Sequence, residues 1–319
     1  MIRRGRVAGL PRTPTPPDTV RVDITELRPP VESGDWPAMT HLPPLHSAPL
    51  RGATSWTGVT YAQVPGFRPL VMDLHVPQGI SSPPVVVWVH GGGWSEGDRR
   101  LVPLQWGQQE LFQRVVDAGI ALATVDYRLV GEVAPDDMVR DLVAALRYVR
   151  HFAADLGIDP ERVAIWGESA GAHLAALAGL AGSADRPDPH FLGRLGVGAG
   201  RTDVAAIIWW YGVSDLAPLP DLAESLWRGV DSDAREWLAM AYSPVTHLGP
   251  TSPPLLIMHG DADGVAPVDQ ALRFHDRALA VGAPSRLVLV PGADHVFLGA
   301  DLTAQWQVAI DFLAEQFAR

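Results

Sequence analysis

The sequence contains neither cysteine nor lysine. Without cysteine it offers no disulfide, no zinc–thiolate site and no thiol nucleophile, so catalysis would have to use oxygen or nitrogen groups. The net charge of −11 disfavours nucleic-acid binding. No apolar run reaches the roughly 18 residues of a membrane span, and the N-terminal residues lack the pattern of a secretory signal. We therefore expect a cytoplasmic protein without a membrane span; secretion of a processed chain is the alternative.

The N-terminal region is unusually rich in proline. Ten of the 29 prolines lie within the first 50 residues, which predicts a proline-rich arm over residues 1–55 that either stays apart or contributes to a cap. The remaining chain is long and apolar enough to bury a large core. We predict one domain over residues 56–319, with insertions near 182–203 and 212–250 that form a small cap.

Strand-like and helix-like segments alternate from about Tyr61 onward, which predicts an α/β fold with a mostly parallel sheet between helices. Residues 84–89 form a short β-branched run that is typical of a buried parallel strand. Apolar residues recur every three or four positions between 136 and 156, which predicts a helix that Gly157 ends. Further strands are predicted at 70–76, 120–125, 163–166, 204–210, 255–259 and 287–290, and further helices at 170–181, 268–280 and 302–317.

The motif GESAG, at residues 167–171, lies where a predicted strand meets a predicted helix. Such a turn strains the backbone of its central residue and lifts that side chain clear of the sheet. Gly167 and Gly171 suit the turn because other backbone must pass close to them. The free N–H groups of the following helix point to where negative charge would develop. We therefore predict that Ser169 is a nucleophile; a chance pattern in a glycine-rich chain is the alternative.

The motif HGGGW, at residues 90–94, follows a predicted buried strand and leaves several backbone N–H groups unshielded. We predict that the N–H groups of Gly92, Gly93 and Ala170 form an oxyanion hole. A phosphate-binding loop is the alternative, but the chain has no lysine and no GxGxxG spacing here. His90 is predicted to brace the loop by hydrogen bonding rather than to act as a base.

A nucleophilic serine needs a base and an acid that orients the base. His295 lies between the predicted strand 287–290 and the last helix, where it could reach the serine, so we predict that it is the base. In this architecture the acid precedes the histidine. Asp261 and Asp263 both follow the strand before, and both fit by position. Asp294 is predicted to be solvated.

These motifs, together with Asp126-Tyr127-Arg128, resemble those of the hormone-sensitive-lipase-like α/β-hydrolases over most of the chain from about Tyr61. The stretches GIDPERVAIWGESAGAHLAAL and PPLLIMHGDADGVAP are similar to the bacterial feruloyl- and acetyl-xylan-esterase-like branch. The resemblance implies an α/β-hydrolase fold without a metal or organic cofactor, and it assigns the acid to Asp263. Ala266 stands where the family usually has valine, a departure that concerns packing.

The resemblance implies ester hydrolysis by a serine nucleophile through an acyl-enzyme and does not fix the substrate. We predict a serine carboxylesterase that hydrolyses short-chain or aromatic carboxylic esters. Its partner would be a small-molecule ester, and a homodimer is one oligomeric state left open. Two rivals remain: an amide hydrolase similar to kynurenine formamidases, and a non-catalytic receptor similar to the gibberellin receptors, which lack the histidine that His295 supplies here.

Residues around the predicted site have expected supporting roles. Asp126, Tyr127 and Arg128 are expected to form a structural network beside the oxyanion loop, and Glu168 is expected to support the site. Tryptophans are candidates to line the substrate pocket, with simple packing of the cap as the alternative. These candidates are Trp94, Trp227 and Trp237.

Overall fold

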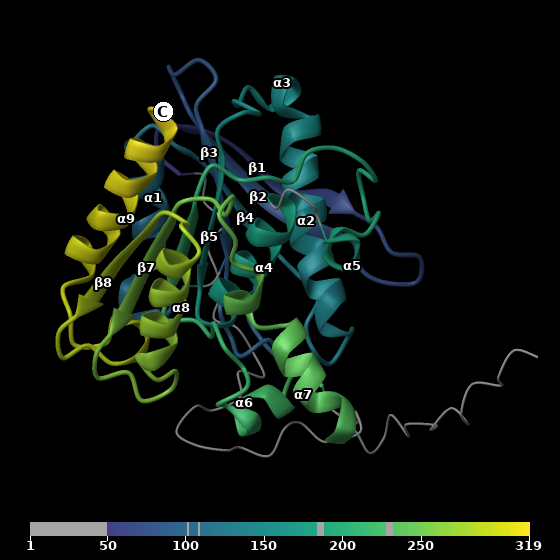
Figure 1. Ribbon diagram of the computed structural model, residues 1–319. Helices are drawn as coiled ribbons and strands as arrows, with labels where there is room; N and C mark the ends of the chain where they lie inside the picture. Colours follow the sequence, from purple (N-terminus) through teal and green to yellow (C-terminus); the bar gives the residue numbers. More distant parts are fainter. Residues whose placement is uncertain (1–49, 101, 108, 184–187, 228–231) are drawn as a thin grey trace, which may run out of the picture. The chain divides into compact units, whose positions relative to one another are not determined.

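The computed structural model describes residues 50–100, 102–107, 109–183, 188–227 and 232–319, which form strands and helices in alternation (Figure 1). The strands are β1 (Ala53–Ala62), β2 (Leu70–Pro77), β3 (Val85–Val89), β4 (Ala121–Val125), β5 (Val163–Glu168), β6 (Ile207–Trp210), β7 (Leu255–Gly260) and β8 (Ser285–Val290). The helices are α1 (Glu110–Asp117), α2 (Pro135–His151), α3 (Ala153–Leu156), α4 (Ala170–Ser183), α5 (Pro189–Leu192), α6 (Pro220–Glu224), α7 (Ser232–Ala241), α8 (Asp269–Ala280) and α9 (Leu302–Phe317). Short 3₁₀ turns are η2 (Leu104–Trp106), η3 (Pro244–His247) and η4 (His295–Phe297).

The strands form one eight-stranded sheet in the order β1-β2-β4-β3-β5-β6-β7-β8. Strand β2 runs antiparallel to both of its neighbours, and all other pairs are parallel. The predicted α/β-hydrolase fold with a mostly parallel sheet is confirmed. The carboxyl ends of parallel neighbours meet at one edge of a sheet, so the loops after β5, β7 and β8 share that edge.

Apolar side chains cover both faces of the sheet, which explains the continuous hydrophobic runs of the central strands. In β3, Val85, Val87 and Val89 pack with α2, α4 and α8 on one face. Val86 and Trp88 pack with α1 and α9 on the other face (Figure 1). Within the described ranges, no helix combines the length and the apolar character needed to cross a lipid bilayer.

The structure differs from the sequence prediction at several element boundaries. Strand β1 begins at Ala53, so residues 53–55, assigned to the arm, pair with β2; the rest of the arm, up to residue 49, lies outside the described residues. The predicted strand 204–210 is shorter, because only Ile207–Trp210 forms β6. The predicted helix 136–156 is two helices that meet at Phe152, and Gly157, with a φ of 70°, ends the second one as predicted.

The two predicted cap insertions contain helices α5, α6 and α7. Helix α5 is tied to α2, because Arg140 donates from Nε to the carbonyl of His190 at 2.8 Å and Arg147 donates to the carbonyl of Gly193 at 3.0 Å. Part of the first insertion, residues 184–187, and part of the second, residues 228–231, lie outside the described residues. That the two insertions act together as a cap stays a prediction.

Candidate active site

Ser169 lies in a strained turn between β5 and α4. Its φ is 51°, in the left-handed region, and its N–H donates to the carbonyl of Trp210 at 2.9 Å. The flanking glycines lie against other backbone: a Cβ at Gly167 would collide with the carbonyl of Gly171, and a Cβ at Gly171 would collide with the carbonyls of residues 89 and 90. Both positions therefore need glycine, as the sequence indicated.

The structure brings the three predicted triad side chains together at one edge of the sheet. Ser169 Oγ lies 3.0 Å from His295 Nε2, and His295 Nδ1 lies 2.8 Å from Asp263 Oδ2. These distances are those of hydrogen bonds from a hydroxyl to an imidazole and from that imidazole to a carboxylate. His295 is only 7% exposed, and the loop after it turns sharply through Val296 and Phe297, each with a φ of 58°.

Asp263 is surrounded by hydrogen-bond donors. Its Oδ1 accepts the N–H groups of Val265 and Ala266 at 2.9 and 2.8 Å. Its Oδ2 lies close to both His295 Nδ1 and His259 Nε2, the latter at 3.2 Å. Burial raises the pKa of Asp263, but the hydrogen bonds from His259 and His295 outweigh burial and hold this pKa well below its usual range. The carboxylate is therefore ionised at neutral pH.

The other two aspartates near this site order the loops instead. Asp261 is exposed, and its Oδ1 accepts the N–H of Gly292 at 2.6 Å. Asp294 is exposed, as the sequence prediction of a solvated side chain implied, and its Oδ1 accepts the N–H groups of Gly264 and His295 at 2.8 and 2.7 Å. Of the three carboxylates, Asp263 is the one bonded to the imidazole of His295.

The glycine loop adopts backbone conformations that favour glycine. Gly92 and Gly93 have φ values of 110° and 57°, and Trp94 follows with 62°. A Cβ at Gly92 would collide with the carbonyl of Glu96. Within the described ranges, the N–H groups of Gly92, Gly93 and Ala170 donate to no other group of the chain. They are thus available for a bound anion, and their role as an oxyanion hole stays a prediction.

Buried side chains hold this loop from two sides. Glu168 Oε1 accepts the N–H of Gly91 at 2.6 Å, and Tyr127 donates from its hydroxyl to the carbonyl of His90 at 3.0 Å. The His90 ring stacks on Tyr127 with 4.3 Å between ring centroids, while its Nδ1–H donates to the carbonyl of Gly91 at 2.7 Å. Burial raises the pKa of Glu168, and the hydrogen bond from Gly91 offsets this only in part. His90 therefore contacts the loop as a brace, in the manner predicted.

A buried histidine that the sequence analysis missed ties the loop to the second insertion. Trp94 donates its indole N–H to His173 Nδ1 at 3.2 Å, and His173 Nε2–H donates to the carbonyl of Tyr242 at 2.7 Å. Burial lowers the pKa of His173 to about 4, so this imidazole is neutral. A histidine among the alanines and leucines of α4, four residues after Ser169, was the signal that could have revealed it.

The three tryptophans named as candidates for the substrate pocket have different surroundings. Trp94 is 2% exposed and has its indole N–H bonded to His173. Trp227 is also buried, with its ring 6.3 Å from that of Tyr242. Burial of both rings favours packing, which was the alternative weighed for them. Trp237 on α7 is 57% exposed, and its contact with substrate stays a prediction.

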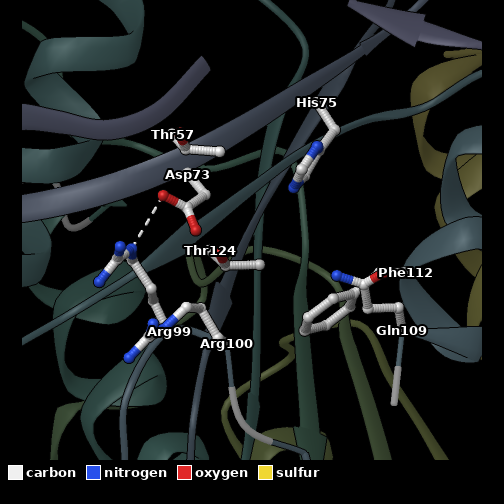
Figure 2. A pocket seen from close by; sticks show the side chains of 8 residues that line it. All are labelled: Thr57, Asp73, His75, Arg99, Arg100, Gln109, Phe112 and Thr124. Carbon is white, nitrogen blue, oxygen red and sulfur yellow. Dashed lines mark ion pairs between the residues drawn. The ribbon is translucent and has the colours of Figure 1, made fainter. Parts of the chain in front are cut away.

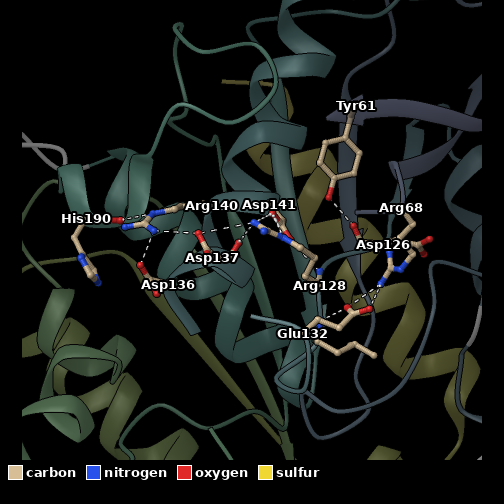
Figure 3. A network of polar contacts seen from close by, with 11 residues as sticks. Tyr61, Arg68, Asp126, Arg128, Glu132, Asp136, Asp137, Arg140, Asp141 and His190 are labelled. Carbon is tan, nitrogen blue, oxygen red and sulfur yellow. Dashed lines mark hydrogen bonds and ion pairs between the residues drawn. The ribbon is translucent and has the colours of Figure 1, made fainter. Parts of the chain in front are cut away.

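The predicted network around residues 126–128 is present at the end of β4 (Figure 3). Arg128 pairs with Asp141 of α2 through two guanidinium nitrogens, with distances of 2.7–3.1 Å. Arg140, the residue before Asp141, donates to the carbonyl of His190 in α5. At the other end of the network, the carbonyl of Asp126 accepts the hydroxyl of Tyr61 in β1 at 2.6 Å. The network joins β1, β4, α2 and α5, an arrangement consistent with the structural role that the sequence predicted.

A separate small cleft lies between β1, β2, β4 and α1 (Figure 2). Both of its guanidinium groups are paired: Arg99 Nε lies 2.9 Å from Asp73 Oδ1, and Arg100 pairs with Asp98 beside the cleft. None of the predicted site residues lines this cleft, so it is not the candidate active site. The lining residues are Thr57, Asp73, His75, Arg99, Arg100, Gln109, Phe112 and Thr124.

The chain matches a known protein family and is similar in sequence to several curated proteins. The sequence profile of the BD-FAE family matches residues 72–278. The chain is similar to the probable carboxylic ester hydrolase LipM of Mycobacterium tuberculosis, with 32% identity over 248 residues that cover 74% of this chain and 55% of LipM. The chain spans 53–66% of the length of three such mycobacterial relatives.

Two solved structures are similar in fold and sequence. A truncated carbohydrate esterase from gut microbiota matches with a TM-score of 0.73 and 26% identity, over 85% of this chain and 99% of the other. A thermophilic esterase from Thermogutta terrifontis, solved with bound butyrate, matches with a TM-score of 0.64 and 27% identity, over 83% of this chain and 95% of the other. Both proteins are described as esterases.

Proposed function

The chain belongs to the BD-FAE family, and on that premise we propose that it is a serine carboxylesterase with Ser169 as nucleophile, His295 as base and Asp263 as orienting acid. The observation that carries the proposal is the continuous series of hydrogen bonds from Ser169 Oγ through His295 to Asp263. A hydroxyl in such a series, at the start of a helix and beside free N–H groups, is equipped for acyl transfer.

In the first half of the reaction, Ser169 Oγ attacks the ester carbonyl carbon while His295 Nε2 takes the hydroxyl proton. Asp263 bonds to Nδ1–H and so keeps Nε2 free to accept that proton. The carbonyl oxygen becomes negatively charged and would bind the N–H groups of Gly92, Gly93 and Ala170. The imidazolium of His295 then gives its proton to the departing alcohol, which leaves an acyl group on Ser169.

In the second half, a water molecule attacks the acyl-enzyme and gives a proton to His295 Nε2. A second oxyanion forms and would bind the same N–H groups. When it collapses, the bond to Ser169 Oγ breaks and His295 returns the proton to that oxygen. The carboxylic acid is released and the starting hydrogen bonds are restored. No step requires a metal or an organic cofactor.

We propose short-chain or aromatic carboxylic esters as the substrate class. The similar Thermogutta terrifontis esterase was solved with butyrate, a four-carbon acid, and this supports a pocket for small acyl groups here. The similar gut enzyme is described as a carbohydrate esterase, which supports esters with a bulky alcohol part. The relatives reported above are named for ester hydrolysis, so amide hydrolysis is not favoured.

The proposal is tested by a hydrolysis panel that contains p-nitrophenyl acetate and butyrate, acetylated xylan, methyl ferulate and N-formylkynurenine. We expect ester turnover at least tenfold faster than formamide turnover, and loss of about 10⁵–10⁶-fold in kcat for Ser169→Ala. Ser252→Ala, which changes a serine in the loop before β7, is the matched control and should keep the parent rate. Ester hydrolysis that survives in Ser169→Ala would contradict the proposal.

A further inference from the structure

A second histidine, which the sequence analysis did not single out, contacts the carboxylate of the proposed triad. His259 lies near the end of β7 and is fully buried. Its Nε2 lies 2.8 Å from the carbonyl of Ala266 and 3.2 Å from Asp263 Oδ2. The same Oδ2 accepts the Nδ1–H of His295 at 2.8 Å. One carboxylate oxygen therefore faces two imidazoles, one from β7 and one from the turn η4 that follows β8.

The contacts of His259 determine which of its ring nitrogens carries the proton. Both neighbours of Nε2, the carbonyl of Ala266 and the carboxylate of Asp263, are acceptors, so Nε2 must be the donor. Its Nδ1 is buried and has no hydrogen-bond partner in the part of the chain that the structure describes. A proton on Nδ1 would be an unpaired buried donor on a ring 5.8 Å from that of Trp209. His259 is thus a neutral imidazole with its proton on Nε2.

We infer that His259 is a positioning residue for the proposed ester hydrolysis: its neutral Nε2–H, which donates to the carbonyl of Ala266, is shared with Asp263 Oδ2 at 3.2 Å and so influences how strongly and in which direction that oxygen binds His295. The inference rests on the proposed function, because it concerns the orientation of the base. With the two backbone donors on Oδ1, the second imidazole completes a set of four N–H groups around the carboxylate. A neutral donor fixes the carboxylate without adding a positive charge that would repel the imidazolium of His295.

The contact between His259 and Asp263 should affect how kcat/KM falls at acidic pH. An oxygen that accepts two hydrogen bonds attracts the imidazolium of His295 less strongly than an oxygen that accepts one. Without the His259 donor, His295 should therefore hold its proton to a higher pH. The other ionisable groups facing His295 are Glu168, Tyr211, whose ring centroid lies 5.0 Å away, and Asp294, and a change at His259 leaves all three in place.

The experiment compares His259→Gln with His259→Leu in the full chain, using kcat/KM for p-nitrophenyl acetate between pH 5 and 9. Glutamine can place an amide N–H near the position of Nε2. The acidic midpoint of kcat/KM in the glutamine variant should therefore stay within about 0.2 pH unit of the parent value. Leucine removes the donor. For the leucine variant we expect an acidic midpoint of kcat/KM about 0.5–1 pH unit higher than in the parent, and a plateau value of kcat/KM about tenfold lower. A lower plateau with an unchanged midpoint in the leucine variant would show that His259 only fills space, and would overturn the inference.

A second measurement does not depend on activity or on the folding of the leucine variant. In the parent protein labelled with ¹⁵N-histidine, His259 should show a proton on Nε2 and none on Nδ1 by NMR. A proton on Nδ1 would overturn the inference. If the parent chain hydrolysed no ester, the proposed function would fail, and the NMR result would still decide whether Nε2 of His259 carries the proton that the inference needs.

Discussion

At the scale of single residues, the two neighbouring aspartates after β7 differ in what their carboxylates bind. Asp263 Oδ2 accepts the imidazole N–H of His295, whereas Asp261 Oδ1 accepts the backbone N–H of Gly292. Position in the sequence left the two equivalent, and only the family resemblance separated them. The choice depends on the path of the loop between them, which a single sequence does not specify.

We predict unequal effects for two conservative changes at these aspartates. Asp263→Asn should lower kcat by about a thousandfold or more, because an amide N–H favours the wrong tautomer of His295. Asp261→Asn, the matched control, keeps an acceptor for Gly292 and should lower kcat by less than about threefold. Steady-state kinetics with p-nitrophenyl butyrate measure both. A reversal of the two effects would move the acid to Asp261 while leaving Ser169 and His295 in their proposed roles.

His173 connects two distant segments as a neutral donor and acceptor. Its pKa of about 4 in the folded chain lies below the ordinary histidine value of 6.5, because burial disfavours the charged form. The unfolded chain therefore binds the proton more readily than the folded chain. The stability that depends on neutral His173 is fully present above about pH 6.5 and is lost as the pH falls toward 4.

We predict that His173→Gln flattens the dependence of stability on pH. Between pH 7.5 and 5, titration of His173 should lower the free energy of unfolding of the parent chain by about 2 kcal/mol. Glutamine does not titrate, so the variant should lose about 2 kcal/mol less over the same interval, although it is less stable at pH 7.5. Urea unfolding at the two pH values measures the difference. Equal losses in both proteins would show that His173 does not remain neutral in the fold.

At the scale of elements, the position of the glycine loop at residues 90–94 depends on side chains from outside the loop. Glu168 at the end of β5, Tyr127 after β4 and His173 in α4 each contact it. The HGGGW motif predicted the position of the loop, because the local backbone conformation requires its glycines. The bond between Trp94 and His173 joins residues 79 positions apart, and no local pattern indicates such a contact.

We predict that Trp94→Phe weakens catalysis through the position of this loop. The change leaves His173 Nδ1 as a buried acceptor without a donor, at a cost of about 1–3 kcal/mol in stability. In their predicted role as an oxyanion hole, the loop N–H groups would act most strongly on the developing oxyanion, so kcat should fall about tenfold with little change in KM. Kinetics with p-nitrophenyl butyrate and thermal melting measure these effects.

The matched control for this change is Trp306→Phe in α9. Its indole is also buried, but its Nε1 has no hydrogen-bond partner in the described ranges, so phenylalanine removes ring volume without leaving an acceptor unpaired. We expect lower stability and an unchanged kcat. If both variants lowered kcat to the same degree, loss of volume rather than the bond to His173 would explain the effect.

Other elements show where sequence patterns are informative. The strands β3, β4, β5 and β7 were predicted closely, because buried parallel strands consist of unbroken apolar runs. Strand β1 was missed: it lies at the edge of the sheet, is half exposed and changes register between Trp56 and Val59. Helix α1 was missed as well, since eight residues give only two turns of apolar periodicity.

At the scale of the whole described domain, the site depends on the strand order of the sheet. Ser169, Asp263 and His295 follow β5, β7 and β8, and these strands lie in parallel with β6 between the first two. Their order along the chain was predicted from the sequence. Their meeting at hydrogen-bond distance was not, because it depends on long-range strand pairing and on the sharp turns at Ser169 and Val296.

We predict a preference for acyl chains of about two to six carbons. Each buried methylene adds about 0.8 kcal/mol of binding only where a continuous apolar tunnel accepts it. The insertion at 182–203 is rich in glycine, arginine and proline, and that at 212–250 interrupts its apolar residues with acids and prolines, so neither supplies such a tunnel. Values of kcat/KM for p-nitrophenyl esters from acetate to palmitate, with a feruloyl ester alongside, measure this preference. A maximum at ten carbons or more would contradict it.

The central claim, that Ser169 is the nucleophile of an ester hydrolase, is tested most directly by covalent labelling. A serine-directed organophosphate should add once per chain, on the peptide that contains Ser169, with loss of esterase activity in proportion to labelling. Intact-mass and peptide mass spectrometry locate the adduct, and Ser169→Ala should remain unlabelled. An adduct on another residue, or full esterase activity in the completely labelled protein, would contradict the claim.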